Sequence, residues 1–330
     1  MHESEEGEHY YRLDESEADA VWIASIDLAG IDARTDVERF CEEAIRRSAS
    51  ISSRMRSAVS HFKRHGNSKG VLILSGLRVG AIPSTPSVND AQVASTTMLC
   101  RQQAVVCSLL GDLIGYEAES SGGLFQDVVP TRRGVRRQVS SGSGVELEAH
   151  TEQAHSPWRP DYVALGCLRG DPRAETFVFS ARSLINHLTR KELMLAFAPM
   201  WKTFVDESFR KCGRKFALGD SRGPMSILYG LEEDPFMVVD QDLMCGIDKA
   251  ASELLAKIVG IFQRDRHSHV IRPGEIVIID NRRTMHGRSN FQPQFDGGDR
   301  FLARSFIIRD LDRCREALLP GSRVIAAELS

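Results

Sequence analysis

The sequence has little of what several large classes of protein require. Its 330 residues contain no apolar run near the roughly 20 residues that a membrane-spanning helix needs. The formal net charge of −3 gives no basic surface field for nucleic acid. We therefore expect neither a membrane nor a nucleic-acid partner. Aromatic residues make up only 7%, yet the apolar share of 42% is enough to bury a substantial core.

Cysteine chemistry is also sparse. The seven cysteines are an odd number and show neither CxxC nor metal-binding spacing. Cys107 and Cys167 lie in apolar runs, which indicates buried, reduced thiols and a cytoplasmic location. The acidic stretch 1–19 lacks the basic and apolar segments of a signal peptide, and we expect residues 1–20 to form a disordered leader.

The following part of the chain has helical character. One helix is expected from Asp36 to Lys63 and a second from about Asp90 to Leu113, with a buried strand at 70–77 between them. No long linker or internal repeat follows. We therefore predict one domain over 21–330, with a helical N-terminal part at 35–113.

From Gly115 onward, short β-type runs alternate with glycine, serine and proline. Strands are expected at 125–129, 145–151, 162–168, 176–179, 226–229, 236–240, 275–280 and 300–308. Helices at about 183–196 and 248–264 should pack outside them. Many short strands separated by turns are typical of a barrel or sandwich, which places a β core at about 115–310.

The pair His150 and Glu152 is the first candidate site. If 148–152 is extended, both side chains point to one face because strand side chains alternate, whereas on a helix they would diverge by roughly 200°. Alone, this short pattern arises easily by chance. His286 follows the predicted strand 275–280 and adds a second imidazole. Two histidines and one carboxylate are the ligands that hold non-haem Fe(II) and leave positions open.

Two arginines are expected on one face of the last strand. Arg300, Leu302, Arg304 and Phe306 are two positions apart and therefore share one face of that strand. A buried guanidinium without an anion is costly, so these side chains predict carboxylate ligands. The alternative is that they pair with structural aspartates at 296 or 299.

Aspartates form a further candidate site. Asp240 and Asp242 should share one face of a strand, and desolvated carboxylates need a cation to stay ionised. Surface or capping roles are the alternative for these residues and for Asp206.

Beyond these residues, the sequence resembles the clavaminate-synthase-like branch of the Fe(II)/2-oxoglutarate-dependent dioxygenases. Within it the resemblance is greatest to hydroxylases of free basic amino acids, and around Glu152 and Phe209 to L-lysine 3-hydroxylases. The motifs that carry it lie at 125–130, 150–154, 159–163, 167–173, 205–209, 240–244, 279–288 and 295–300. The resemblance implies a double-stranded β-helix, a cupin-like jelly roll, with helices on its outer face.

The resemblance also implies roles for the metal and co-substrate residues. His150, Glu152 and His286 would bind Fe(II), which reacts with O2. Arg300, helped by the hydroxyl of Thr176, would hold the distal carboxylate of 2-oxoglutarate.

The amino-acid substrate would have its own set of contacts. Arg304 would take the α-carboxylate, and Gln126 would take the α-ammonium together with the free oxygen of the carboxylate ligand. Asp206, Asp240 and Asp242 would bind the side-chain cation.

The expected reaction is hydroxylation of free L-lysine at C3, giving hydroxylysine, succinate and CO2. Attack at C4, or on L-arginine or L-ornithine, is the near alternative. Two other classes remain, a zinc hydrolase on the same triad and a non-catalytic cupin-like binding module. The motif offers the hydrolase no general base or acid for the leaving group, and the module would have no need for the triad and Arg300 together.

Overall fold

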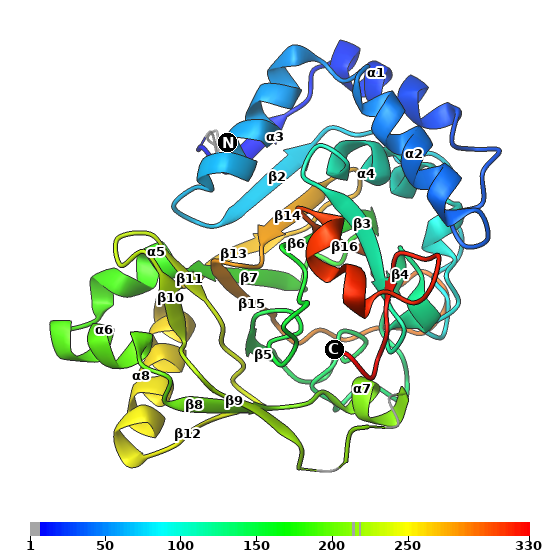
Figure 1. Cartoon of the computed structure of the whole chain (residues 1–330). Helices are drawn as coiled ribbons and strands as arrows, with labels where there is room; N and C mark the ends of the chain where they lie inside the picture. The colour runs from blue at the N-terminus through cyan, green and yellow to red at the C-terminus, as the bar shows by residue number, and fades with distance from the viewer. Residues whose placement is uncertain (1–6, 213–214, 218) are drawn as a thin grey trace.

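Two facing β-sheets organise the protein. The computed structural model describes residues 7–212, 215–217 and 219–330 (Figure 1). The larger sheet has eight strands in the order β1-β2-β14-β6-β16-β3-β17, with β4 pairing with β16. These strands are β1 (Tyr10–Arg12), β2 (Val71–Ser75), β3 (Asp112–Tyr116), β4 (Gln126–Val128), β6 (Tyr162–Arg169), β14 (Ile276–Asp280), β16 (Phe301–Ile308) and β17 (Val324–Ile325).

Alternation along each strand gives the larger sheet two different buried faces. On β16, Phe301, Ala303 and Ile307 pack with the N-terminal helices, while Leu302 and Phe306 belong to the core on the opposite face. Figure 1 shows these helices together on one side of the molecule. They are α1 (Glu15–Ile26), α2 (Val37–Ser48), α3 (Ser53–His65) and α4 (Met98–Cys107).

The smaller sheet has the antiparallel order β13-β7-β15-β5. Its strands are β5 (Leu147–His150), β7 (Glu175–Ser180), β13 (His267–Val270) and β15 (Thr284–Arg288). Phe177 and Met285 face outward into a core shared with the buried stripe of α8 (Lys249–Asp265). Because side chains alternate, Thr176 and His286 face the opposite way, toward the larger sheet.

Smaller elements lie along the chain between β7 and β13, two strands of the smaller sheet. A three-stranded sheet has the order β12-β8-β9, and β10 pairs with β11. Their bounds are β8 (Trp201–Phe204), β9 (Ser221–Met225), β10 (Leu228–Gly230), β11 (Pro235–Met237) and β12 (Met244–Gly246). The short helices α5 (Ala181–Leu184), α6 (Arg190–Phe197) and α7 (Glu207–Cys212) lie in the same part of the chain, and 3-10 turns occur at Ala94–Thr96, Ser120–Gly122, Ile185–His187 and Leu311–Ala317.

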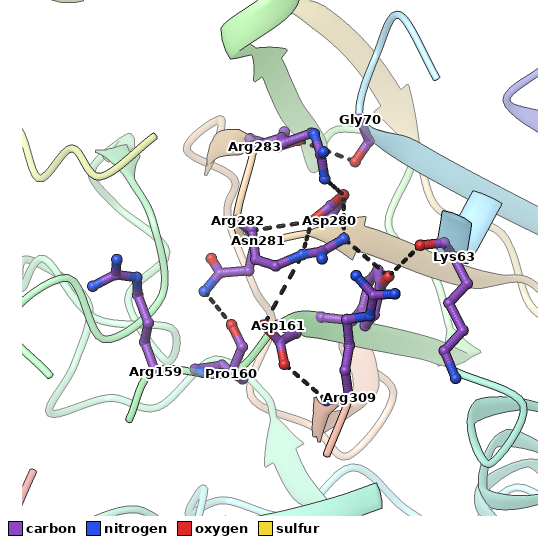
Figure 2. A network of polar contacts seen from close by, with 12 residues as sticks. Lys63, Gly70, Arg159, Pro160, Asp161, Asp280, Asn281, Arg282, Arg283 and Arg309 are labelled. Atoms are coloured by element: carbon purple, nitrogen blue, oxygen red, sulfur yellow. Dashed lines mark hydrogen bonds and ion pairs between the residues drawn. The ribbon is translucent and has the colours of Figure 1, made fainter. Parts of the chain in front are cut away.

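A buried charge cluster fixes the turn between β14 and β15. Asp280, 0% exposed, accepts hydrogen bonds from Arg282 Nε at 3.0 Å and Arg283 Nη1 at 3.2 Å. Arg283 is also paired with Asp234 at 3.1 Å. Figure 2 shows Asp280 between the two arginines. The turn at 281–283 is therefore held at its base by ion pairs as well as by the strand ladder.

The prediction of a disordered leader is wrong for residues 7–20. Residues 1–6 lie outside the described part of the chain. β1 pairs in parallel with β2. The acidic residues that suggested disorder begin a helix instead. Asp14 accepts the Glu17 N–H at 2.9 Å, and the Glu17 carboxylate returns to the Asp14 N–H in a capping box. Glu17 also pairs with Arg54.

The predicted helix 36–63 is two helices, α2 and α3. The break comes at Ser52, whose hydroxyl accepts the Met55 N–H at 3.1 Å and so starts α3. The second predicted helix, 90–113, is shorter, because Thr97 caps α4 and residues from Asp112 join the larger sheet. A sheet-rich architecture with helices on its outer faces is confirmed. None of the described helices is long and apolar enough to cross a membrane.

Strand β8 offers a test of core packing. Trp201 is 0% exposed and donates its indole N–H to Ala251 O at 3.1 Å, whereas Phe204 on the same strand is 39% exposed. We expect Trp201→Ala to lower the free energy of unfolding by about 3–5 kcal/mol, because it leaves a cavity in the core. The matched control Phe204→Ala should cost less than about 1 kcal/mol. Denaturant titrations measure both, and equal losses would contradict this packing.

Candidate metal and substrate site

A cavity of about 850 Å³ opens between the two sheets. All ten residues predicted to form the site line it: Gln126, His150, Glu152, Thr176, Asp206, Asp240, Asp242, His286, Arg300 and Arg304. The chain therefore brings together residues that are separated by up to 178 positions, as in the contact between Gln126 and Arg304.

The two histidines of the triad are neighbours across a strand pair. His150 on β5 lies opposite His286 on β15 in the antiparallel register, and their ring centroids are 4.3 Å apart. One ligand atom from each of His150, Glu152 and His286 lies within 4.8 Å of the other two. His150 Nδ1 is 2.8 Å from Glu148 O, so this nitrogen can donate there and leave Nε2 for a metal. Two imidazoles and a carboxylate at this separation fit a single metal ion.

Glu152 departs from the predicted geometry. The expected strand 145–151 is β5, which ends at His150, so Glu152 lies beyond it in a turn. Its carboxylate still reaches the histidines, with Oε2 at 3.7 Å from His286 Nε2. Burial acts to raise the pKa of Glu152, but Arg304 and the two imidazoles outweigh it and lower the pKa to about 2. The carboxylate is thus ionised and ready to bind a cation.

One end of the cavity lacks an anion. Arg300 is 5% exposed, and its guanidinium forms no hydrogen bond or ion pair with any residue that the structure describes. The hydroxyl of Thr176 is buried and likewise lacks a partner among the described residues. Burial lowers the pKa of Arg300 to about 10, so the side chain stays charged at neutral pH. Buried donors without acceptors are costly, which favours a carboxylate ligand here.

The alternative partners for Arg300 are engaged elsewhere. The Asp299 carboxylate accepts the backbone N–H groups of Gln294 and Phe295, both at 2.7 Å. Asp296 accepts the Gly298 N–H at 2.8 Å. Neither aspartate forms an ion pair with Arg300 in the described chain, so the interpretation that they hold it is wrong. The nearby Asp171, whose charge acts on Arg300, is itself paired with Arg173 at 2.8 Å.

Arg304 sits between the two ends of the cavity. Its guanidinium donates to Glu152 Oε1 at 3.0 Å, to Glu119 Oε2 at 2.8 Å and, through Nε, to Gln126 Oε1 at 2.9 Å. The Gln126 oxygen is thereby occupied, and its Nε2 is left without a partner among the described residues. The Nε2 group can only donate hydrogen bonds. The Gln126 oxygen would therefore have to lose its contacts with Arg304 before it could accept a hydrogen bond from an ammonium group.

The other end of the cavity is acidic. Burial raises the pKa of Asp240 to about 7. The pKa of Asp206, which directly precedes α7, rises to about 6 through burial and the nearby Glu119 and Glu152. A bound cation would favour the ionised form of both groups. Asp242 lies exposed at the rim of the same end.

The predicted strand through Asp240 and Asp242 is wrong. Asp240 forms an isolated bridge with His150, and residues 241–243 are a turn. The turn forms because Asp240 Oδ1 accepts the N–H groups of Asp242 at 3.0 Å and Leu243 at 2.8 Å. Both carboxylates nevertheless line the same cavity, because the turn, and not a strand, brings them there.

Two residues of the site escaped the sequence reasoning. Glu119 binds Arg304, but no local pattern marks it because its partner is 185 residues away. Asn281 binds the backbone of Glu152 through hydrogen bonds of 2.7 and 3.1 Å. Asn281 could have been noticed in the sequence because it forms, with Asp280, a polar pair that directly follows an apolar strand.

The chain is similar to known proteins in sequence and in fold. A sequence model of the taurine catabolism dioxygenase TauD, TfdA family matches residues 62–306. An L-lysine 3-hydroxylase from Catenulispora acidiphila is 48% identical over 92% of this chain and 85% of its own. The solved structure of asparagine oxygenase with Fe(II), 2S,3S-3-hydroxyasparagine and succinate superposes with a TM-score of 0.89 at 30% identity, covering 96% of this chain and 99% of that one. The non-heme iron oxygenase OrfP, solved with Fe and alpha-ketoglutaric acid, gives 0.85 at 26% identity over the same shares.

The triad geometry predicts metal-dependent stability. Adding Fe(II) without oxygen, at about 100 times its dissociation constant, should stabilise the chain by about 2.7 kcal/mol and raise its melting temperature. His286→Ala should abolish most of this gain because it removes one of three ligands. His61→Ala, at an exposed position of α3, is the control that should keep it. A full iron-dependent shift in the His286 variant would refute the assignment of this histidine as a ligand.

Proposed function

We propose that this chain, which belongs to the taurine catabolism dioxygenase TauD, TfdA family, hydroxylates a free basic L-amino acid with Fe(II), 2-oxoglutarate and O2. The substrate we propose is L-lysine and the position C3, giving hydroxylysine, succinate and CO2. One observation carries the proposal: the triad of His150, Glu152 and His286 lines one cavity together with an arginine and aspartates that form no ion pair with any residue that the structure describes.

The proposed fold is a double-stranded β-helix in which the two facing sheets are the two halves, within one domain that extends the predicted range 21–330 to include β1 and the start of α1. It is supported by inward-facing residues on both sheets, Arg304 from β16 and His286 from β15, that line one cavity. Strands would hold five of the ten site residues, including both histidines of the triad, as a rigid catalytic geometry requires. The free cysteines support a cytoplasmic location.

His150, Glu152 and His286 would hold the iron. Fe(II) bound to such a triad keeps positions open for O2 and a 2-oxo acid, and it supplies the oxidising chemistry that breaks an unactivated C–H bond. Arg304 contributes by pairing with Glu152, which holds that ligand ionised. The enclosing sheets exclude bulk water from the reacting centre.

Arg300 and Thr176 would bind the distal carboxylate of 2-oxoglutarate. Both lack a partner for their polar groups within the described chain, and both line the cavity with the triad. A dicarboxylic acid is suited to this arrangement because one carboxylate can bind the arginine while the oxo-acid end reaches the metal. Arg300 thereby sets the distance at which the co-substrate lies from the triad.

The acidic end would bind the side chain of the amino acid. Lysine brings an ammonium that Asp206, Asp240 and Asp242 otherwise lack, and its charge would hold them ionised. Arg304 would contact the α-carboxylate, and Gln126 with Glu152 the α-ammonium, after the rearrangement of Gln126 described above. Asparagine would leave the aspartates without a cation, which favours a basic substrate over the one in the asparagine oxygenase complex.

The choice among basic amino acids rests on the lysine 3-hydroxylase relative. L-arginine, L-ornithine and attack at C4 remain the alternatives, since arginine products also occur in OrfP complexes. The zinc hydrolase and the non-catalytic module are less well supported. Neither explains why Arg300 and Thr176 are left unpaired beside the triad.

A product screen tests the proposal. The chain, purified without oxygen, is given Fe(II), 2-oxoglutarate, ascorbate and air with each standard amino acid or ornithine. We expect mass spectrometry to find one added oxygen atom on lysine, equal amounts of succinate, and NMR signals of a C3 alcohol. A product from arginine alone would refute the substrate, and no consumption of 2-oxoglutarate would refute the enzyme class.

The two ends of the cavity should be separable by substitution. Arg300→Met should raise the KM for 2-oxoglutarate about 100-fold, as expected when a charge-assisted contact of roughly 3 kcal/mol is lost. Asp240→Asn should raise the KM for lysine by a similar factor. Asparagine keeps the oxygen that accepts the Asp242 and Leu243 N–H groups, so the turn is preserved.

Each variant is the control for the other in steady-state assays. The KM for lysine should change little in Arg300→Met, and the KM for 2-oxoglutarate should change little in Asp240→Asn. Equal changes of both constants in either variant would contradict the assignment of separate ends.

A further inference from the structure

Glu152 differs from the other two residues of the triad in how its backbone is supported. His150 and His286 belong to paired strands, β5 and β15. Glu152 lies in a turn after β5 and is followed by Gln153, which has a φ of 56°. A non-glycine residue in this left-handed region marks a tight change of chain direction. The strand ladder that holds the histidines therefore does not extend to the carboxylate.

The side chain of Asn281 takes the place of that ladder. Its Oδ1 accepts the Glu152 N–H at 2.7 Å, and its Nδ2 donates to Glu152 O at 3.1 Å. The same Nδ2 donates to Pro160 O at 2.9 Å, a contact visible in Figure 2. One amide thus satisfies both backbone groups of a single residue, as a neighbouring strand would.

Asn281 is itself rigidly placed. It is 0% exposed, and its backbone N–H donates to Asp161 O at 3.0 Å. It also begins the turn that the Asp280 ion pairs hold at its base (Figure 2). Five positions later the same segment reaches His286. One short piece of chain therefore carries one histidine of the triad and the support of the carboxylate.

We propose that Asn281 is a positioning residue that fixes the backbone of Glu152 and so sets the affinity of the triad for its metal. This inference rests on the proposed function, because it takes Glu152 as a ligand. Without the amide, two backbone groups of Glu152 would lose their partners and the turn could relax. Supporting hydrogen bonds of this kind commonly change metal affinity by 10- to 100-fold.

A second buried asparagine provides a matched control. Asn67 is 5% exposed, and its side chain also holds a turn. Its Oδ1 accepts the Gly70 N–H at 2.7 Å, and its Nδ2 donates to Val71 O at 2.8 Å. Asn67 does not line the triad cavity. Removing either asparagine should destabilise the fold, and both turns contact the segment at 280–284, but only Asn281 bonds directly to a residue of the triad.

The test measures Fe(II) binding rather than turnover. Under oxygen-free conditions, without 2-oxoglutarate, the full-length chain is titrated with Fe(II). Asn281→Ala should weaken binding about 10- to 100-fold, while Asn67→Ala should bind as tightly as the unchanged chain. Both variants should show a lower melting temperature in the absence of metal. Unchanged iron affinity in a folded Asn281→Ala protein would overturn the proposal.

Asn281→Asp serves if the alanine variant fails to fold. The aspartate has the same size and keeps an acceptor for the Glu152 N–H, but it replaces the donor by an oxygen that faces two carbonyl groups. Iron affinity should again fall, and a value equal to that of the unchanged chain would also overturn the proposal.

His286→Ala separates this inference from the function on which it rests. If His286→Ala weakens binding and the Asn281 variants do not, only the role of Asn281 is refuted. If His286→Ala also leaves binding unchanged, the metal site itself is refuted.

Discussion

The pairing of β5 with β15 is the constraint on which the rest of the site depends. It sets His150 opposite His286 and, through β7, places Thr176 on the same inner face. A slip by one residue would turn every one of these side chains outward, because strand side chains alternate. The outer face opposes such a slip, since Phe177 and Met285 are buried against α8 and its neighbours. The apolar packing on the outer face of the smaller sheet thus fixes which side chains point into the cavity from its inner face.

Charge is distributed along the cavity in a way that stability alone would not favour. Arg300 at one end and Asp240 at the other are buried and form no ion pair with any residue that the structure describes, and burial shifts the pKa of each toward its neutral form. Arg304 in the middle is fully engaged, and its ion pair with Glu152 lowers the pKa of that carboxylate. The protein therefore leaves the charges at the two ends for small molecules, whereas Arg304 could contact a substrate carboxylate only after its present contacts rearrange. Sites of this kind commonly cost stability.

The sequence predicted the parts of this design that rest on local periodicity. Alternation on the last strand correctly placed Arg300 and Arg304 on one cavity, and the helix expected at about 248–264 is α8. Features decided by distant partners could not be foreseen. The Glu152 backbone is held by a side chain 129 positions away. The turn after Asp240 is local, because its own carboxylate creates it, but the apolar residues before Asp240 suggested a continuing strand instead. The break between α2 and α3 was hidden because residues on both sides continue one amphipathic pattern, although Ser52 is a good cap.

The parallel pairing of β1 with β2 has a consequence for the outer edge of the larger sheet. β2 is buried along its whole length, and β1 covers its free side with the pairs Tyr10–Ile73, Tyr11–Leu74 and Arg12–Ser75. If this short strand peeled away, the edge of β2 would present unpaired backbone groups beside a run of valine, leucine and isoleucine. Such an edge recruits strands from other molecules and leads to aggregation. β1 thus covers an edge that would otherwise favour self-association.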